Sequence, residues 1–218
     1  MASVADLESV SKLYGTFVAL RKVSLSFERG RCCVLLGENG AGKSTLLRLI
    51  AGLIRPTYGG VRVFGEKPED ARARIGYMSH APMLYDELSG EENLRYFASL
   101  YRERTCMSPE AALGSVGLDA SLTRPVGQYS QGMRQRASLA RVMLSQPELL
   151  LLDEPFSNMD AASGQQMLNL LVRLRAEGKT ILLTTHQREL AEPVADFLLT
   201  LQAGSVASLV ETAAGARG

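Results

Sequence analysis

A glycine-rich stretch in the first quarter of the chain has the residue types and spacing that bind phosphate groups. It fits the pattern G-x-x-x-x-G-K-[ST] and lies between a short apolar run and a helical pattern. Its members and the residue after them are Gly37, Glu38, Asn39, Gly40, Ala41, Gly42, Lys43, Ser44 and Thr45. The glycines let backbone N–H groups close around phosphate oxygens, and the following helix adds the positive end of its dipole. Lys43 reaches the terminal phosphates and Ser44 offers a hydroxyl to Mg²⁺, so the stretch predicts a nucleotide site.

Two adjacent carboxylates form a second chemical feature. An apolar run over residues 149–152 ends in Asp153 and Glu154. Asp153, at the end of a predicted strand, is suited to hold Mg²⁺ through water. Glu154 lies one residue further, where a base can orient and activate an attacking water. The alternative for Glu154 is a solvated loop acid with no catalytic role.

The chain has only two histidines, and each follows a predicted strand. His80 comes shortly after residues 75–78, and His186 closes the run 182–185. A histidine after a strand is more often structural than functional. Its imidazole can nevertheless donate a hydrogen bond to water or phosphate, or bind a metal, so both are candidate site residues.

Hydrophobic runs, helical patterns and turn residues alternate along most of the chain, which is typical of an α/β protein. Strands are predicted at 31–36, 61–64, 75–78, 149–152 and 180–184, and helices at 43–51 and 161–176. Between about 82 and 145 the pattern changes to three helices, at 91–101, 109–116 and 131–145. We therefore expect one domain over 1–218, with a parallel-sheet lobe (about 1–80 and 146–210) interrupted by a helical lobe (about 81–145). The Ala- and Gly-rich end, 211–218, is expected to be frayed.

A phosphate loop alone is equally typical of kinases, GTPases and motor ATPases, and the second half of the chain distinguishes among them. Residues 129–136, Tyr-Ser-Gln-Gly-Met-Arg-Gln-Arg, lie before the apolar strand that ends in the Asp-Glu pair. They resemble the signature of ABC ATPases, normally a Ser-Gly-Gly-Gln core that opens a helix. Ser130 and Gly132 are retained, whereas Gln131 and Met133 depart from that core. With the other motifs, the resemblance covers essentially the whole chain.

The resemblance implies roles for further residues. Tyr14, which precedes a Val-Ser-Leu-Ser-Phe strand, looks like the aromatic that stacks on adenine. Residues 157–160 resemble the loop that couples opposed subunits. His186 looks like the switch histidine that contacts the γ-phosphate. His80 stands where the family usually has the glutamine that senses Mg²⁺ and the attacking water, so it departs from the family pattern.

The resemblance also implies a fold and an assembly. The expected fold is α/β, a P-loop NTPase (RecA-like) core with a helical subdomain and a small N-terminal antiparallel β region. ATP and Mg²⁺ are the expected cofactors, and a homodimer is expected in the presence of ATP, with the phosphate loop of one copy facing Ser130 and Gly132 of the other. A transmembrane permease subunit is the expected partner, which places the chain at the cytoplasmic face of the cell membrane.

Composition bounds the function in three ways. A formal net charge of +1 argues against a broad basic surface, so no nucleic acid partner is expected. No apolar stretch is long enough to span a bilayer, and no secretory signal is visible. The three cysteines, two of them adjacent at Cys32 and Cys33, cannot form a disulfide framework or a spaced zinc site. They are expected to be reduced thiols in the core.

The transported substrate is predicted from a finer resemblance. Residues 80–97, together with the Thr-Thr-His-Gln ending at 184–187, resemble the ATPase of the haem exporter of cytochrome c maturation. Haem export for cytochrome c biogenesis is therefore the specific prediction. The Tyr-Ser-x-Gly-Met form of the signature is shared with drug and lipid exporters, which are the alternative. ABC ATPases of DNA repair or translation are a further one, although the chain has one cassette and no coiled-coil heptads.

Overall fold

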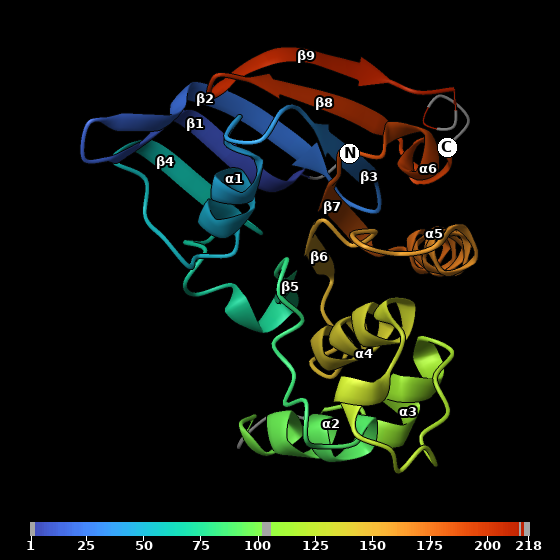
Figure 1. Ribbon diagram of the computed structural model, residues 1–218. Helices are drawn as coiled ribbons and strands as arrows, with labels where there is room; N and C mark the ends of the chain where they lie inside the picture. The colour runs from blue at the N-terminus through green and yellow to red at the C-terminus, as the bar shows by residue number, and fades with distance from the viewer. Residues whose placement is uncertain (1–2, 102–105, 214, 216–218) are drawn as a thin grey trace.

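The structure, a computed structural model, describes residues 3–101, 106–213 and 215. Its larger sheet has six strands in the order β5-β6-β7-β3-β8-β9 (Figure 1). The strands are β3 (Cys32–Leu36), β5 (Ile75–Met78), β6 (Leu149–Asp153), β7 (Thr180–Thr184), β8 (Phe197–Gln202) and β9 (Ser205–Glu211). All neighbours are parallel except β8 and β9. The central strands β6 and β7 are buried along their whole length, which explains their uninterrupted apolar runs.

A second, antiparallel sheet is formed mainly by the start of the chain. Its order is β2-β1-β4, with β1 (Ser3–Tyr14) and β2 (Phe17–Glu28) joined by a two-residue turn and β4 (Tyr58–Val63) added to β1. Gly15 has a φ of 59° in this turn, a conformation that glycine adopts at little cost. Helix α1 (Lys43–Ile50) lies beside this sheet in Figure 1.

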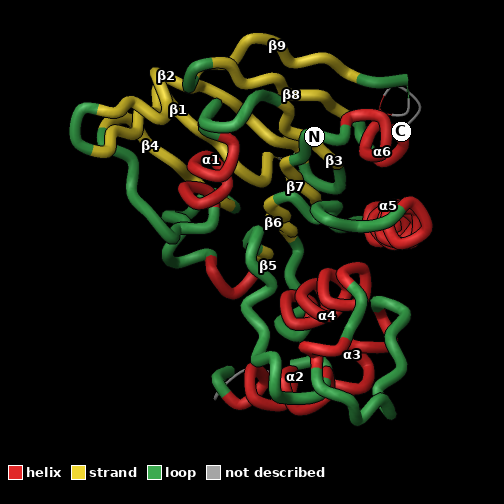
Figure 2. The backbone as a smooth tube through the Cα atoms, viewed as in Figure 1, coloured by secondary structure: helices red, strands yellow, loops and turns green. Residues whose placement is uncertain are grey.

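Three helices form a separate cluster beside the larger sheet, at the bottom of Figure 2. They are α2 (Gly90–Ser99), α3 (Pro109–Ser115) and α4 (Gln131–Met143). Each begins with a serine whose side chain accepts a hydrogen bond from the first turn: Ser89, Ser108 and Ser130. At α2 the cap is reciprocal, because the Glu92 carboxylate accepts the Ser89 N–H at 2.8 Å.

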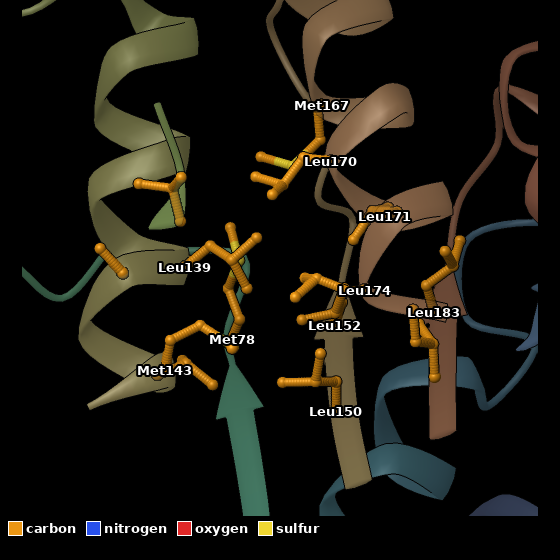
Figure 3. Close-up of a cluster of buried hydrophobic side chains, with 14 of the residues drawn as sticks. Met78, Leu139, Met143, Leu150, Leu152, Met167, Leu170, Leu171, Leu174 and Leu183 are labelled. Atoms are coloured by element: carbon orange, nitrogen blue, oxygen red, sulfur yellow. The ribbon is translucent and has the colours of Figure 1, made fainter. Parts of the chain in front are cut away.

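The two faces of the larger sheet carry different cores, because successive side chains of a strand point in opposite directions. Leu149 and Leu151 belong to an apolar cluster shared with α1 and the antiparallel sheet. Leu150 and Leu152 belong to a second cluster, shared with α4 and α5 (Ala161–Ala176). Figure 3 shows side chains of α4 and α5 gathered around these two leucines. The remaining helix, α6 (Arg188–Ala191), is a single turn after β7.

The α/β fold predicted from the sequence is confirmed, including the antiparallel region. The helix predicted at 161–176 has those bounds, and the other predicted helices end one or two residues earlier in the structure. The pair β8 and β9 was not predicted. The end expected to be frayed begins at the last residue of β9, Glu211, and residues 214 and 216–218 lie outside the described residues. No helix in the described ranges has the length and apolar character needed to cross a membrane.

Candidate functional site

The glycine-rich loop connects β3 to α1, as its motif requires. At two of its positions only glycine fits, because the backbone has a positive φ and a Cβ atom would clash with a neighbouring carbonyl group. Gly37 has a φ of 141°, and a Cβ there would lie 2.3 Å from the Leu201 carbonyl oxygen. Gly42 has a φ of 104°, and its Cβ would lie 2.6 Å from the Ala19 carbonyl oxygen. Any side chain at either position would displace backbone, so the curvature of the loop depends on glycine.

The Lys43 side chain is folded back into the loop. Its Nζ donates to the carbonyl oxygens of Gly37 at 2.6 Å and Glu38 at 3.1 Å, and the residue is only 7% exposed. The ammonium is therefore held by neutral carbonyl groups where phosphate oxygens would compete for it. A phosphate is the stronger partner for an ammonium, because it adds the attraction between opposite charges to the hydrogen bond, whereas a carbonyl oxygen is neutral.

Asp153 lies at the carboxyl end of β6 and meets the loop directly. Its Oδ1 accepts hydrogen bonds from Ser44 Oγ at 2.9 Å and from Thr184 Oγ1 at 2.7 Å. Thr184 ends β7, which pairs with β6 in parallel, so the sheet itself brings these ends together. The site fits Mg²⁺, which is bound by hard oxygen donors, typically one or two protein groups supplemented by phosphates and water. In keeping with this, the described residues include no group of three His, Cys, Asp or Glu side chains able to enclose a metal.

Glu154 follows Asp153 but points to a different partner. Its Oε2 lies 3.1 Å from Nδ1 of His186, and its side chain is 15% exposed against 64% for the histidine. The backbone N–H of Glu154 donates to the Thr184 carbonyl at 3.2 Å and to its hydroxyl at 3.0 Å. The carboxylate is thus largely buried in the wall of the site, with its Oε2 turned toward an exposed imidazole.

Tyr77, on β5, adds a neutral polar group near this carboxylate pair. Burial raises the pKa of its hydroxyl, and the negative charge of Asp153 acts in the same direction. The nearby positive charge of Arg48, on α1, partly opposes that rise. Tyr77 therefore stays protonated and brings no further negative charge to the site.

These residues share one cavity of about 750 Å³. Its lining consists of Phe17, Ala19, the loop residues from Gly37 to Thr45, His80, Asp153, Glu154 and His186. The structure thus brings both histidines, both carboxylates and the phosphate loop together. Tyr14 is not part of the lining; its ring is 45% exposed and lies under the Lys12 ammonium, 5.1 Å from its centroid. Phe17, which pairs with Tyr14 across the β1–β2 turn, lines the cavity instead and was missed in the sequence.

Ser130 and Gly132 lie outside this cavity, at the start of α4. Ser130 Oγ accepts the Met133 N–H at 3.2 Å, so its hydroxyl caps its own helix. Gly132 has no room for a side chain, because a Cβ there would lie 2.5 Å from Cβ and Oγ of Ser163. Within one copy of the chain, the signature and the phosphate loop are therefore separate surfaces. That separation is compatible with the expected assembly, in which the two surfaces meet between copies.

Comparisons with known proteins agree with the site. The sequence profile of a family described as "ABC transporter" matches residues 20–157. A fluoroquinolones export ATP-binding protein of Mycobacterium tuberculosis is 39% identical over 195 residues, covering 88% of this chain. The ABC transporter ATP-binding protein NatA of Bacillus subtilis is 36% identical, covering 86% of this chain and 80% of NatA. A Nod factor export ATP-binding protein of Rhizobium johnstonii is 40% identical, covering 91% of this chain.

The chain spans 64% of the length of the M. tuberculosis relative and 66% of the Rhizobium one. Among solved structures, the ATP-binding cassette MJ0796 superposes with a TM-score of 0.85 at 27% identity, covering 95% of this chain and 98% of that one. That cassette was solved as a dimer in a post-hydrolysis state, bound to ADP and Pi. The family profile covers more than half of the chain, and NatA matches over most of both sequences. The chain therefore belongs to the ATP-binding proteins of the ABC transporter family.

Proposed function

We propose that this chain hydrolyses Mg-ATP and that the reaction powers export through a separate membrane subunit. The observation that carries the proposal is the single cavity in which the phosphate loop, the Ser44–Asp153 pair and Glu154 meet. Each group has a separate task there. The loop binds phosphate, the oxygen pair suits a metal, and Glu154 lines the same cavity, where its carboxylate can act on water.

The residues act in a defined order on this proposal. Lys43 exchanges its carbonyl partners for phosphate oxygens and binds the terminal phosphates. Ser44 and Asp153 would hold Mg²⁺, which would supply charge neutralisation at the phosphates. Glu154 accepts a proton from, and orients, the attacking water. His186 leaves the Glu154 carboxylate and donates to the γ-phosphate, so that one imidazole serves two partners at different stages.

The assembly on this proposal is a homodimer in the presence of ATP. Ser130 and Gly132 stand away from the cavity of their own copy, at the amino end of α4, where backbone N–H groups favour an anion. A second copy, turned head to tail, brings this helix end to the γ-phosphate. The fold and the relation to MJ0796, which was solved as a dimer, support this arrangement.

Hydrolysis and assembly are tested together on the purified chain. We expect Mg²⁺-dependent phosphate release from ATP that disappears in the Lys43→Ala variant, because no other lysine or arginine is among the described residues that line the cavity. We expect the Glu154→Gln variant to double its molar mass by light scattering in Mg-ATP but not in ADP. No phosphate release from the parent, in the presence or absence of a membrane subunit, would contradict the proposed function.

The relatives favour a drug or lipid over haem as the transported substrate. Two of the named relatives act in export, one of fluoroquinolones and one of Nod factor, whereas the name of NatA gives no cargo. We therefore propose export of an amphipathic small molecule at the cytoplasmic face of a membrane, through a transmembrane permease subunit. Haem export rests on His80 and the Thr-Thr-His-Gln ending, and no relative named here supports it.

Transport in vesicles containing the chain and its permease distinguishes these substrates. A fluoroquinolone or Nod factor should stimulate ATP hydrolysis and accumulate in inverted vesicles, whereas haem should do neither. The Lys43→Ala variant provides the control, since it retains the permease contacts but loses the energy source. Stimulation by haem alone would overturn the drug and lipid assignment and restore the haem one.

A further inference from the structure

The turn that carries Glu154 is held in an unfavourable backbone conformation. Glu154 has a φ of 56°, in the left-handed region that a non-glycine residue adopts only at a cost in free energy. Such a conformation persists only where neighbouring contacts fix it on both sides. On the amino side, Thr184 accepts the Glu154 N–H through its carbonyl and its hydroxyl. On the carboxyl side, the Ser157 N–H donates to the Glu154 carbonyl at 3.1 Å.

The Ser157 side chain is hydrogen-bonded to α4, the helix that begins in the signature. Gln135, on α4, donates from Nε2 to Ser157 Oγ at 3.1 Å, and the two residues are 4% and 5% exposed. In the parts of the chain that the structure describes, no group donates to Gln135 Oε1, so Ser157 is the side chain's polar partner. A buried amide with a single partner is costly for stability. The hydrogen bond between Gln135 and Ser157 joins the middle of α4 to the turn that follows Glu154.

The same face of α4 is pressed against the segment after Ser157. Gly132 lies three residues before Gln135, hence on the same face of the helix, and meets Ser163 of α5 without room for a Cβ. Figure 3 shows α4 and α5 facing each other across the end of β6. Ser138, one turn further along α4, donates to the Pro82 carbonyl at 3.0 Å, two residues after His80. One rigid helix thus contacts the segments that follow both Glu154 and His80.

We propose that Gln135 is a positioning residue for Glu154, acting through Ser157. Without its hydrogen bond, Ser157 is released, the strained turn relaxes, and the carboxylate leaves the place where it meets water. Nucleotide binding is unaffected, because the phosphate loop is held by β3 and α1. The proposal rests on the proposed role of Glu154 as the base. It assigns to Gln135 an effect on turnover that is separate from any contact of the signature with nucleotide.

A double-mutant cycle of steady-state ATP hydrolysis tests this. Gln135→Met and Ser157→Ala should each lower kcat about fivefold to tenfold, the equivalent of one lost hydrogen bond, with KM for ATP changed less than twofold. The double variant should match the worse single variant within twofold, because both changes remove the same contact. Gln165→Met is the matched control, since this exposed glutamine on α5 donates to its helix neighbour Asn169, away from the turn after Glu154, and should leave kcat unchanged.

The same substitution in a variant that lacks the Glu154 carboxylate distinguishes an effect on Glu154 from an effect on the signature, residues 129–136. In Glu154→Gln, which already lacks the carboxylate, Gln135→Met should change the residual turnover by less than twofold. Additive effects in the cycle, or a further loss in this background, would overturn the positioning role while leaving the proposed function intact. Full turnover by Glu154→Gln itself would instead overturn the proposed role of Glu154. A shift in KM without a shift in kcat would assign Gln135 to nucleotide binding.

Discussion

At the scale of single residues, the aromatic side of the nucleotide site differs from the sequence prediction. Phe17 lines the cavity and is 58% exposed, so its ring is free to stack on a base. Tyr14 remains the residue implied by the family resemblance, and it sits across the same turn. Phe17, which lines the cavity, is therefore a second candidate for the base contact beside Tyr14, which does not line it.

Replacing Phe17 by alanine should raise KM for ATP about fivefold and leave kcat nearly unchanged, because stacking on a base contributes about 1–3 kcal/mol to binding alone. Steady-state kinetics over a range of ATP concentrations measures both constants. Phe17→Tyr is the control and should behave as the parent. A KM within twofold of the parent in Phe17→Ala would exclude Phe17 from the base contact, and Tyr14→Ala measured alongside would show whether Tyr14 carries it.

The sequence predicts candidate site residues best where the residue types and their spacing have a single chemical use. The phosphate loop, Asp153 and Glu154 are recognisable because their spacing is set by backbone geometry between a strand and a helix. Phe17 belongs to no motif with such a spacing, and an aromatic residue on a strand most often only packs against its neighbours. The role of Gln135 could not be predicted either. Its partner Ser157 is distant in the sequence, and the two side chains become adjacent only when α4 packs on α5.

At the scale of elements, β3 carries two adjacent thiols in a dry environment. Burial raises the pKa of Cys33 to about 12, and the charge of Asp196 adds to this. The folded protein therefore keeps a proton that the unfolded chain loses at lower pH. Stability linked to this thiol is fully present below the unfolded pKa and is lost as the pH rises toward the folded one.

The free energy of unfolding should fall by about 1 kcal/mol between pH 8 and pH 10 through Cys33 alone. Urea titrations at the two pH values measure it. In Cys33→Ala this part of the pH dependence should disappear, whatever the variant's absolute stability. Cys106→Ala, which changes a less buried thiol, is the control and should retain the slope. An identical slope in Cys33→Ala would refute the assignment.

The reciprocal cap at Ser89 gives a prediction for α2. Ser89→Ala should destabilise the start of the helix by about 1 kcal/mol, so its amide hydrogens should exchange roughly fivefold faster. Hydrogen-exchange mass spectrometry on peptides spanning α2 measures this. Ser99→Ala, at the other end of α2, leaves the cap intact and is the control. Equal exchange in the parent and Ser89→Ala would mean that tertiary packing alone holds α2.

The helix Ala161–Ala176 was predictable to the residue because Asp160 caps its start and its apolar positions repeat with helical spacing. The pair β8 and β9 was not. β9 lies at the edge of the sheet, and most of its residues are exposed on both faces, so its sequence carries no alternation of apolar and polar residues. Its pairing with β8 comes from the turn at Gly204, whose φ is 81°, rather than from a hydrophobic pattern.

At the scale of the whole molecule, helix α4 joins the two parts of the structure. Its amino end carries Ser130 and Gly132, its middle contacts the turn after Glu154, and its apolar side packs on β5 and β6 (Figure 3). On the proposed function, a nucleotide bound between two copies touches this helix in one copy and the phosphate loop in the other. The central claim of this account is that Glu154 acts on water while the phosphate loop binds the nucleotide.

The measurement that tests this claim most directly is ATP turnover by Glu154→Gln, compared with its affinity for Mg-ATP by calorimetry. Glutamine preserves the shape and the backbone contacts but removes the proton acceptor. We predict unchanged affinity within about twofold and a loss of turnover of at least about 100-fold, the usual contribution of a general base. Turnover within a few-fold of the parent, with Mg-ATP still bound, would contradict the account.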